Sequence, residues 1–212
     1  MAEPSLQLGN GNWAGKSGNL LAYHKVDTNF YADELTFTRA STGTIVNSDG
    51  LIEQVPYNLL TYSEELDNTW TPTNTTVTSG QSGYDGSNNA WLVDVSVDGG
   101  NLRKDTSEVG INNFSIYAKK GTANGIRIRF DQDSDVNVYI DLTDGSVFIS
   151  ANTLSLNVNS EGSGWYRIEF SFEAAGLNLF RLITTDGTTT QSAGSIYLQS
   201  PQLVSGSAAK TY

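Results

Sequence analysis

The sequence is poor in the residues on which covalent, thiolate and nucleophilic chemistry depend. Its 212 residues include no cysteine and a single histidine, His24. The absence of cysteine excludes disulfides, thiolate catalysis and zinc–sulfur sites. The sequence has no G-x-S-x-G motif around a serine and no Gly-rich phosphate-binding loop. With a single histidine as well, it lacks the residues that nucleophilic triads and nucleotide-binding sites usually require. Acidic residues are numerous, but their spacing selects no pair for glycoside hydrolysis. We therefore expect a protein that is not an enzyme.

Basic charge and long apolar runs are also scarce. Lys and Arg number 12 against 23 Asp and Glu, which gives a net charge of −11. Nucleic acid is not an expected partner, because binding the phosphate backbone requires clustered basic charge. No apolar run reaches 18 residues, and the first residues lack the basic and apolar regions of a signal peptide. We therefore expect no membrane span and synthesis in a cytoplasm.

Turn-forming residues and alternating apolar rows dominate what is present. Ser, Thr, Asn and Gly make up about 40% of the chain, and these residues disfavour helix interiors. From Leu35 onward, apolar and polar residues alternate with a period of two, and Asp144-Gly145 predicts a tight hairpin turn. The apolar rows are Phe114/Ile116/Ala118, Ile126/Ile128/Phe130, Val136/Val138/Ile140/Leu142 and Tyr166/Ile168/Phe170/Phe172. The pattern predicts an all-β fold, a two-sheet antiparallel jelly-roll β-sandwich.

The first 30 residues lack this alternation and are rich in Gly and Asn. Trp13, Leu20 and Leu21 stand in this segment as isolated apolar residues, a pattern expected of a chain that orders on binding a partner. We therefore expect residues 1–56 to form an irregular N-terminal attachment arm, with these three residues at its interface. Residues 57–212 are expected to form the sandwich.

Some side chains on the polar side of the alternating rows are aromatic. Tyr117 and Tyr139 point away from the apolar rows of their own strands, because successive side chains of a strand alternate between its two faces. Four polar residues share that outward side: Arg127, Arg129, Asn137 and Asp141. If these strands are neighbours in one sheet, the six residues line one surface. That surface suits a glycan carrying carboxylate or phosphate, and it suits a subunit interface equally well.

One string of acidic residues invites a metal interpretation. Asp131, Asp133 and Asp135 alternate as in the opening of an EF-hand loop, but Val136 replaces the required glycine and Leu142 the bidentate glutamate. The EF-hand interpretation therefore fails. A looser calcium site on the rim of the sandwich remains one hypothesis. The alternative is a solvated turn whose carboxylates balance Arg127 and Arg129. No other cofactor is expected.

Two strings resemble a segment that recurs in bacteriophage fibre, spike and head-decoration proteins. They are Phe37-Thr38-Arg39-Ala40-Ser41-Thr42 and Val46-Asn47-Ser48-Asp49-Gly50-Leu51-Ile52-Glu53, with Gly43 where that segment usually carries Ala. Further strings are similar to jelly-roll carbohydrate-binding modules. These are Asn58-Leu59-Leu60, Ile140 to Val147, Gly162-Ser163-Gly164-Trp165-Tyr166-Arg167 and Ser195-Ile196-Tyr197-Leu198. The resemblance covers about residues 35–212.

This resemblance implies a structural protein on the virion surface, made in the host cytoplasm. A head fibre or capsid-decorating protein is favoured, because 212 residues leave room for one module and no long shaft. The arm would bind other virion proteins, of the capsid or the tail, and the sandwich would project and adhere to glycans. The alternative is a tail fibre or baseplate adhesin that recognises host surface polysaccharide. Phage fibres and spikes are usually three-fold, so we expect a homo-oligomer, with a trimer favoured over a dimer.

Overall fold

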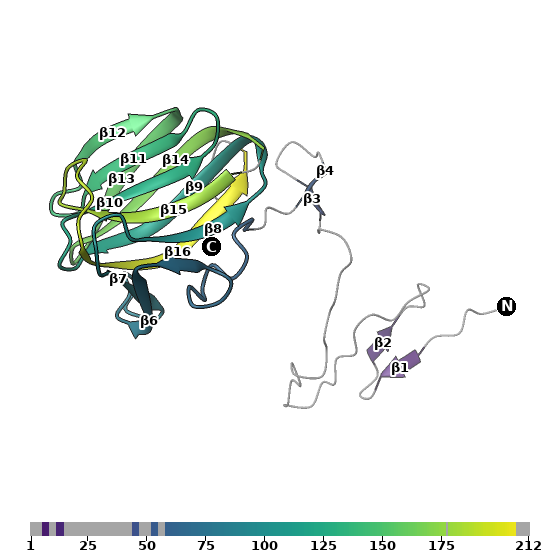
Figure 1. Ribbon diagram of the computed structural model, residues 1–212. Helices are drawn as coiled ribbons and strands as arrows, with labels where there is room; N and C mark the ends of the chain where they lie inside the picture. Colours follow the sequence, from purple (N-terminus) through teal and green to yellow (C-terminus); the bar gives the residue numbers. More distant parts are fainter. Residues whose placement is uncertain are drawn as a thin grey trace. The chain divides into compact units, whose positions relative to one another are not determined.

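The computed structural model describes residues 58–176 and 178–206 and, nearer the N-terminus, the backbone of four short strands (Figure 1). The chain divides into two units, Met1–Val55 and Pro56–Tyr212. Every regular element in these described parts is a strand. No helix in the same parts has the length and apolar character needed to cross a membrane.

The N-terminal unit contains two short antiparallel hairpins. Strand β1 (Leu6–Leu8) pairs with β2 (Asn12–Ala14), and β3 (Thr44–Val46) pairs with β4 (Ile52–Gln54). The segment expected to be irregular therefore carries some strand pairing. Trp13 lies in β2, whereas Leu20 and Leu21 lie outside the described residues. The attachment role of these three residues stays a prediction.

The C-terminal unit is a sandwich of two six-stranded antiparallel sheets, which confirms the predicted fold. Sheet I has the order β12-β11-β10-β15-β8-β5, and sheet II has the order β13-β14-β9-β16-β7-β6. The strands of sheet I are β5 (Thr71–Thr73), β8 (Asn101–Thr106), β10 (Gly125–Asp131), β11 (Val136–Asp141), β12 (Val147–Ala151) and β15 (Asn178–Thr185). Those of sheet II are β6 (Thr75–Gln81), β7 (Ala90–Val95), β9 (Val109–Lys120), β13 (Thr153–Gly162), β14 (Trp165–Ala175) and β16 (Gly194–Ser205).

The connectivity of the eight central strands is that of a jelly roll. These strands, numbered one to eight in chain order, are β7 to β11 followed by β14 to β16. Their order across sheet II is then 1-8-3-6, and their order across sheet I is 2-7-4-5. Each sheet thus pairs strands that are far apart in the sequence, as two interlocked Greek keys require. Strands β5, β6, β12 and β13 extend the two sheets at their edges.

The predicted apolar rows fill the space between the sheets. Phe114 of β9 lies 5.7 Å from Phe130 of β10 and 4.9 Å from Phe180 of β15, measured between ring centroids. Phe130 in turn lies 4.4 Å from Phe172 of β14. These rings are fully buried, and the offset and edge-on arrangements are those that aromatic pairs prefer. The inner face of each sheet is thereby fixed, and every second side chain points outward.

The Asp144-Gly145 turn joins β11 to β12, as the sequence predicts. Gly145 has a φ of 82°, a left-handed conformation that glycine adopts without steric cost. The Asp144 carboxylate accepts a hydrogen bond from the backbone N–H of Ser146 at 2.9 Å. Hydrogen bonds from Ser146 hold the pKa of Asp144 below its usual range. The turn is therefore closed by its own residues.

Candidate functional site

Strands β10 and β11 place four of the predicted site residues together on the outer face of sheet I, the side turned away from sheet II. Arg127 stands opposite Tyr139, and Arg129 stands opposite Asn137. All four side chains are partly buried, and their neighbours along each strand belong to the core. The expected juxtaposition of an aromatic ring with two guanidinium groups and an amide is confirmed for these residues.

Arg127 is held between Asn137 and the ring of Tyr139. Its Nε and one terminal nitrogen both donate to the Asn137 Oδ1, at 3.0 and 2.7 Å. Its guanidinium carbon lies 5.1 Å from the ring centroid of Tyr139, within the range of a cation–π contact. Burial lowers the pKa of Arg127, but the group stays charged at neutral pH. Because its acceptor is a neutral amide, the positive charge of Arg127 is not compensated by this contact.

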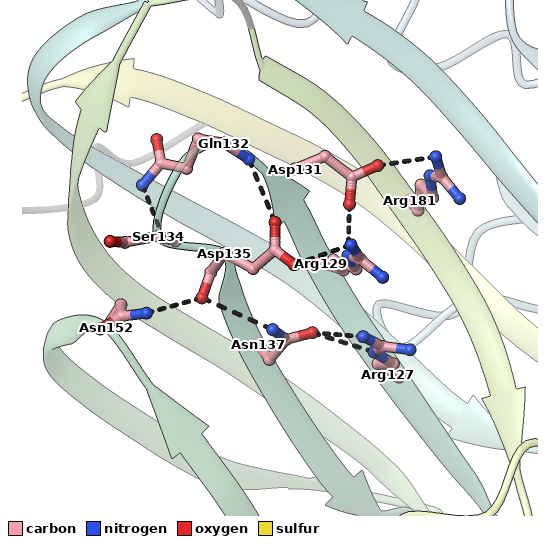
Figure 2. A network of polar contacts seen from close by, with 9 residues as sticks. All are labelled: Arg127, Arg129, Asp131, Gln132, Ser134, Asp135, Asn137, Asn152 and Arg181. Atoms are coloured by element: carbon pink, nitrogen blue, oxygen red, sulfur yellow. Dashed lines mark hydrogen bonds and ion pairs between the residues drawn. The ribbon is translucent and has the colours of Figure 1, made fainter.

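Arg129 belongs to an ionic network at the end of the same face (Figure 2). It forms ion pairs with Asp131 and, at 2.7 Å, with Asp135. The second carboxylate oxygen of Asp131 binds Arg181 of β15 at 2.7 Å. Asp131 thus bridges two arginines from neighbouring strands.

Two carboxylates of the aspartate string are engaged by arginines, as the solvated-turn alternative expects, and the calcium site stays a prediction. Asp131 and Asp135 bind Arg129 and Arg181, while Asp133 is exposed at the tip of the β10–β11 turn. Across the described ranges, no three His, Cys, Asp or Glu side chains are grouped as a metal ion would need. In the solvated-turn interpretation, Arg181 stands in place of Arg127 as the second arginine.

The β10–β11 turn is tied to its surroundings by amide side chains. Gln132 donates to the backbone carbonyl of Glu173 at 3.0 Å and accepts from the N–H of Ala175 at 3.1 Å. Asn152, in the turn between β12 and β13, donates to the carbonyl of Asp135 at 2.8 Å (Figure 2). The turn that carries these carboxylates is therefore held by contacts from the end of β14 and from the β12–β13 turn.

Asp141 lies on the same side of sheet I, but its carboxylate serves the hairpin turn. Its Oδ1 accepts the backbone N–H of Thr143 at 2.7 Å, and its backbone carbonyl accepts that of Gly145 at 2.8 Å. Asp141 stands opposite Gly125, at the end of β11 away from the ionic network. Its observed contacts are those of a turn residue.

Tyr117 corrects the expectation of one surface carrying both tyrosines. It lies on β9, in sheet II, so its outward side faces away from sheet I and from Tyr139. Its ring is stacked on that of Tyr84 at 3.6 Å between centroids, with an angle of 6° between the planes. Contact with Tyr117 and burial raise the pKa of Tyr84 to about 12. The alternation placed Tyr117 correctly on its own strand, but the strand belongs to the other sheet.

Two further arginines on this face are not among the site residues predicted from the sequence. Arg181 of β15 stands directly opposite Arg129, and Arg103 of β8 stands directly opposite Arg181. We call Arg129, Arg181 and Arg103 the arginine row. Alternation within each strand points all three outward, but their alignment depends on strand pairing across long sequence separations. No local signal in the sequence carries that information.

A cleft of about 290 Å³ lies elsewhere, beside the edge of sheet II. It is lined by Glu64, Ser79, Gly80, Asn88, Asn89 and Trp91. Trp91 is buried, and its indole N–H donates to the carbonyl of Glu64 at 3.1 Å. Trp91 thus lines the cleft and is hydrogen-bonded to Glu64, which lines the same cleft.

No protein-family model matches the chain, and no curated protein sequence matches it. Solved structures with a similar fold exist. One is the CBM22-1 xylan-binding domain of Paenibacillus barcinonensis Xyn10C, 13% identical over 73% of this chain and 95% of that chain, with a TM-score of 0.44. Another is the CBM22-1–GH10 region of Clostridium thermocellum Xyn10B complexed with xylohexaose, 13% identical over 68% of this chain, with a TM-score of 0.42.

A third similar structure is the enzymatically active domain of tailspike protein 4 from bacteriophage CBA120, 16% identical over 69% of this chain, with a TM-score of 0.42. The present chain spans 27% of the Xyn10B chain and 21% of the tailspike chain. At these identities and TM-scores, the neighbours do not identify what this chain binds.

Proposed function

We propose that the sandwich binds glycan through the outer face of sheet I. The observation that carries the proposal is the Tyr139–Arg127–Asn137 group, in which an aromatic ring, a guanidinium and an amide are held together on one exposed strand pair. A tyrosine ring offers an apolar platform for the C–H face of a sugar, and the amide and guanidinium groups donate to sugar oxygens. Arg129 and Asn137 extend the polar part of the face. This role is one of binding, without catalysis.

The test compares two tyrosines on opposite sides of the molecule. Tyr139→Ala removes the ring on sheet I, and Tyr117→Ala removes a ring on sheet II as a matched control. On an array of bacterial and plant polysaccharides, we expect Tyr139→Ala to lose about tenfold or more in affinity, the loss typical of one stacking or anchoring aromatic. Tyr117→Ala should bind like the unaltered protein. Equal loss in both variants, or retention in Tyr139→Ala, would refute binding at this face.

We further propose that the protein is a structural component of a bacteriophage virion, a head fibre or capsid-decorating protein displayed on the particle surface. The support comes from the Phe37–Thr42 and Val46–Glu53 strings, which resemble the segment preceding modules of phage surface proteins. In this proposal the N-terminal unit attaches to other virion proteins and the sandwich projects, as a homotrimer, to adhere to glycans.

Labelled antibody against the sandwich tests the virion role on particles of a phage that encodes the chain. Label over the head would support the head fibre or decoration role. Label at the tail tip would replace it with the adhesin role, in which the same glycan-binding face recognises host polysaccharide. Particles without label, despite expression of the protein during infection, would contradict both versions.

A further inference from the structure

The arginine row crosses three neighbouring strands of sheet I on the proposed glycan-binding face. Arg129, Arg181 and Arg103 occupy directly opposed positions on β10, β15 and β8. Arg127 stands two residues from Arg129 on the same side. Four of the five arginines in residues 58–176 and 178–206 therefore share one face, in a chain whose net charge is −11.

Such a row costs stability unless it is compensated, because like charges directly opposite each other on a sheet repel. Asp131 and Asp135 compensate Arg129 and Arg181. In the described part of the chain, no carboxylate oxygen lies within 4.0 Å of a side-chain nitrogen of Arg103 or Arg127. Asp105 and Asp141, the other acidic side chains on this side, form no ion pair within that distance. Four guanidinium groups therefore share the face with four carboxylates, of which only Asp131 and Asp135 form ion pairs with arginines.

Donor capacity on the row is also unused. The Nε of Arg181 is buried and has no hydrogen-bond partner. Arg103 is half-buried and makes no side-chain hydrogen bond to the rest of the described protein. A buried polar atom without a partner is costly, so an arriving carboxylate gains more here than at a satisfied surface. Arg181, which carries this donor, stands directly opposite Arg103 of β8.

We propose that the ligand of this face is an acidic glycan, whose sugar carboxylates are bound by Arg103 and Arg181 while a ring packs near Tyr139. This inference rests on the proposed glycan-binding function and adds the ligand class. Guanidinium groups bind carboxylates through two parallel hydrogen bonds, and a row of them one strand apart presents several such forks along an extended chain. A neutral polysaccharide would leave Arg103 and Arg127 without a carboxylate partner.

Matched polymers test the ligand class. Oligosaccharides of alginate and of polygalacturonate, and the same oligosaccharides after reduction of every carboxyl to a primary alcohol, are titrated into the full chain by calorimetry. We expect the acidic forms to bind about tenfold or more tightly than the reduced forms, because hydrogen bonds between charged groups are stronger than those to a neutral hydroxyl. Raising the salt concentration should erode that preference.

Variants then assign the preference to the row. Arg103→Gln should bring the acidic forms down to the affinity of the reduced forms, and Arg103→Lys should retain part of the preference, since lysine keeps the charge but lacks the fork. Arg167→Gln, on the outer face of sheet II, is the matched control and should change nothing. Thermal unfolding of each variant verifies that the fold is kept.

The outcomes separate the ligand class from the glycan-binding function. If reduced and acidic forms bind equally, or if Arg103→Gln keeps the preference, the acidic class is wrong and glycan binding stands. If no form binds, both fail. If single-stranded DNA of similar length binds as tightly as the acidic oligosaccharides, the face is a nonspecific polyanion site and the glycan assignment is overturned.

Discussion

Asp131 is the residue that makes the arginine row compatible with a folded sheet. It binds Arg129 and Arg181 at once, so a single carboxylate compensates two opposed positive charges. Asp133, two residues away, is exposed and forms no ion pair within the described residues. Asp131 and Asp133 carry the same charge in the same turn, but only Asp131 contacts arginines. Comparing them therefore separates the effect of the ion pairs from the effect of net charge.

Asp131→Asn should lower the free energy of unfolding by about 1 kcal/mol, because it releases the repulsion between the two arginines at a partly exposed site. Asp133→Asn should be nearly neutral although it changes the net charge equally. Urea unfolding measures both variants, and the difference between them should shrink in concentrated salt. Equal destabilisation by the two substitutions would show that stability depends on net charge and not on the contact of Asp131 with the two arginines.

Tyr84 is a residue whose pKa is clearly raised by its surroundings. Its contact with Tyr117 and its burial raise its pKa from 10.0 to about 12, so the folded state favours the neutral phenol. The stabilisation is complete below pH 10 and is lost as the pH rises toward 12. Ultraviolet titration should show one late phenol that disappears in Tyr84→Phe. In Tyr117→Phe the titration of Tyr84 should move back toward 10; an unchanged late step would refute this pairing.

At the scale of elements, the β11–β12 hairpin depends on one glycine. A Cβ added to Gly145 would lie 2.6 Å from Cε1 of Tyr166, and its φ of 82° already disfavours any other residue. Gly86 has a φ of 80°, but a Cβ there would meet nothing within 4 Å. A comparison of substitutions at these two glycines therefore separates the cost of backbone strain from the cost of a steric contact.

Gly86→Ala should cost about 1–2 kcal/mol in the free energy of unfolding, the cost of a left-handed conformation alone. Gly145→Ala should cost more, because the Tyr166 ring must also move away from the core edge. Urea midpoints compare the two. If both variants lose the same stability, the ring accommodates the methyl group and the contact does not constrain the hairpin.

The same elements show what a sequence can and cannot predict. Alternation predicted that Ile126, Ile128 and Phe130 point inward and that Arg127 points outward, because a strand has only two sides. The turn residues Asp144-Gly145 also predicted the hairpin that joins β11, the strand of Tyr139, to β12. It could not assign Tyr117 to a sheet, since β9 pairs with β14 and β16, which lie far along the chain. The arginine row escaped notice for the same reason.

The calcium hypothesis shows a related ambiguity. Alternating aspartates are compatible with cation binding and with ion pairing, and the choice depends on what stands opposite them. Arg181 lies on β15, about fifty residues further along the chain than Asp131. Only the pairing of β10 with β15 brings the two side chains together. Metal ligation and salt bridging use the same side chains, so local sequence could not distinguish them.

At the scale of the whole molecule, one edge of the sandwich is unusually apolar. Edge strands β12 and β13 expose Phe148 (49%) and Leu154 (60%), and residues 145–160 contain no charged side chain. Sheet edges are normally protected by charge or proline, because their free backbone groups pair with other chains. In a protein of net charge −11, identical copies repel least where charge is absent. We propose this edge as the contact between copies in the proposed homotrimer.

Phe148→Asp should dissociate the oligomer to a single chain of 22.9 kDa, because it places three like charges at the contact. Val109→Asp alters an exposed apolar residue at the start of β9 and should leave the oligomer intact. Light scattering at micromolar concentration measures both. A monomer in the unaltered protein, or an oligomer that survives Phe148→Asp, would contradict this contact.

The central claim, glycan binding by the outer face of sheet I, is tested most directly by NMR titration of the isotope-labelled protein with alginate oligosaccharide. Binding at this face predicts that the shifted signals cluster on β8, β10, β11 and β15, and include the guanidinium N–H of Arg103 and Arg127. Signals from β9, β14 and the Tyr84–Tyr117 pair should stay in place. Shifts confined to sheet II or to the Trp91 cleft, or no shifts at all, would contradict the claim.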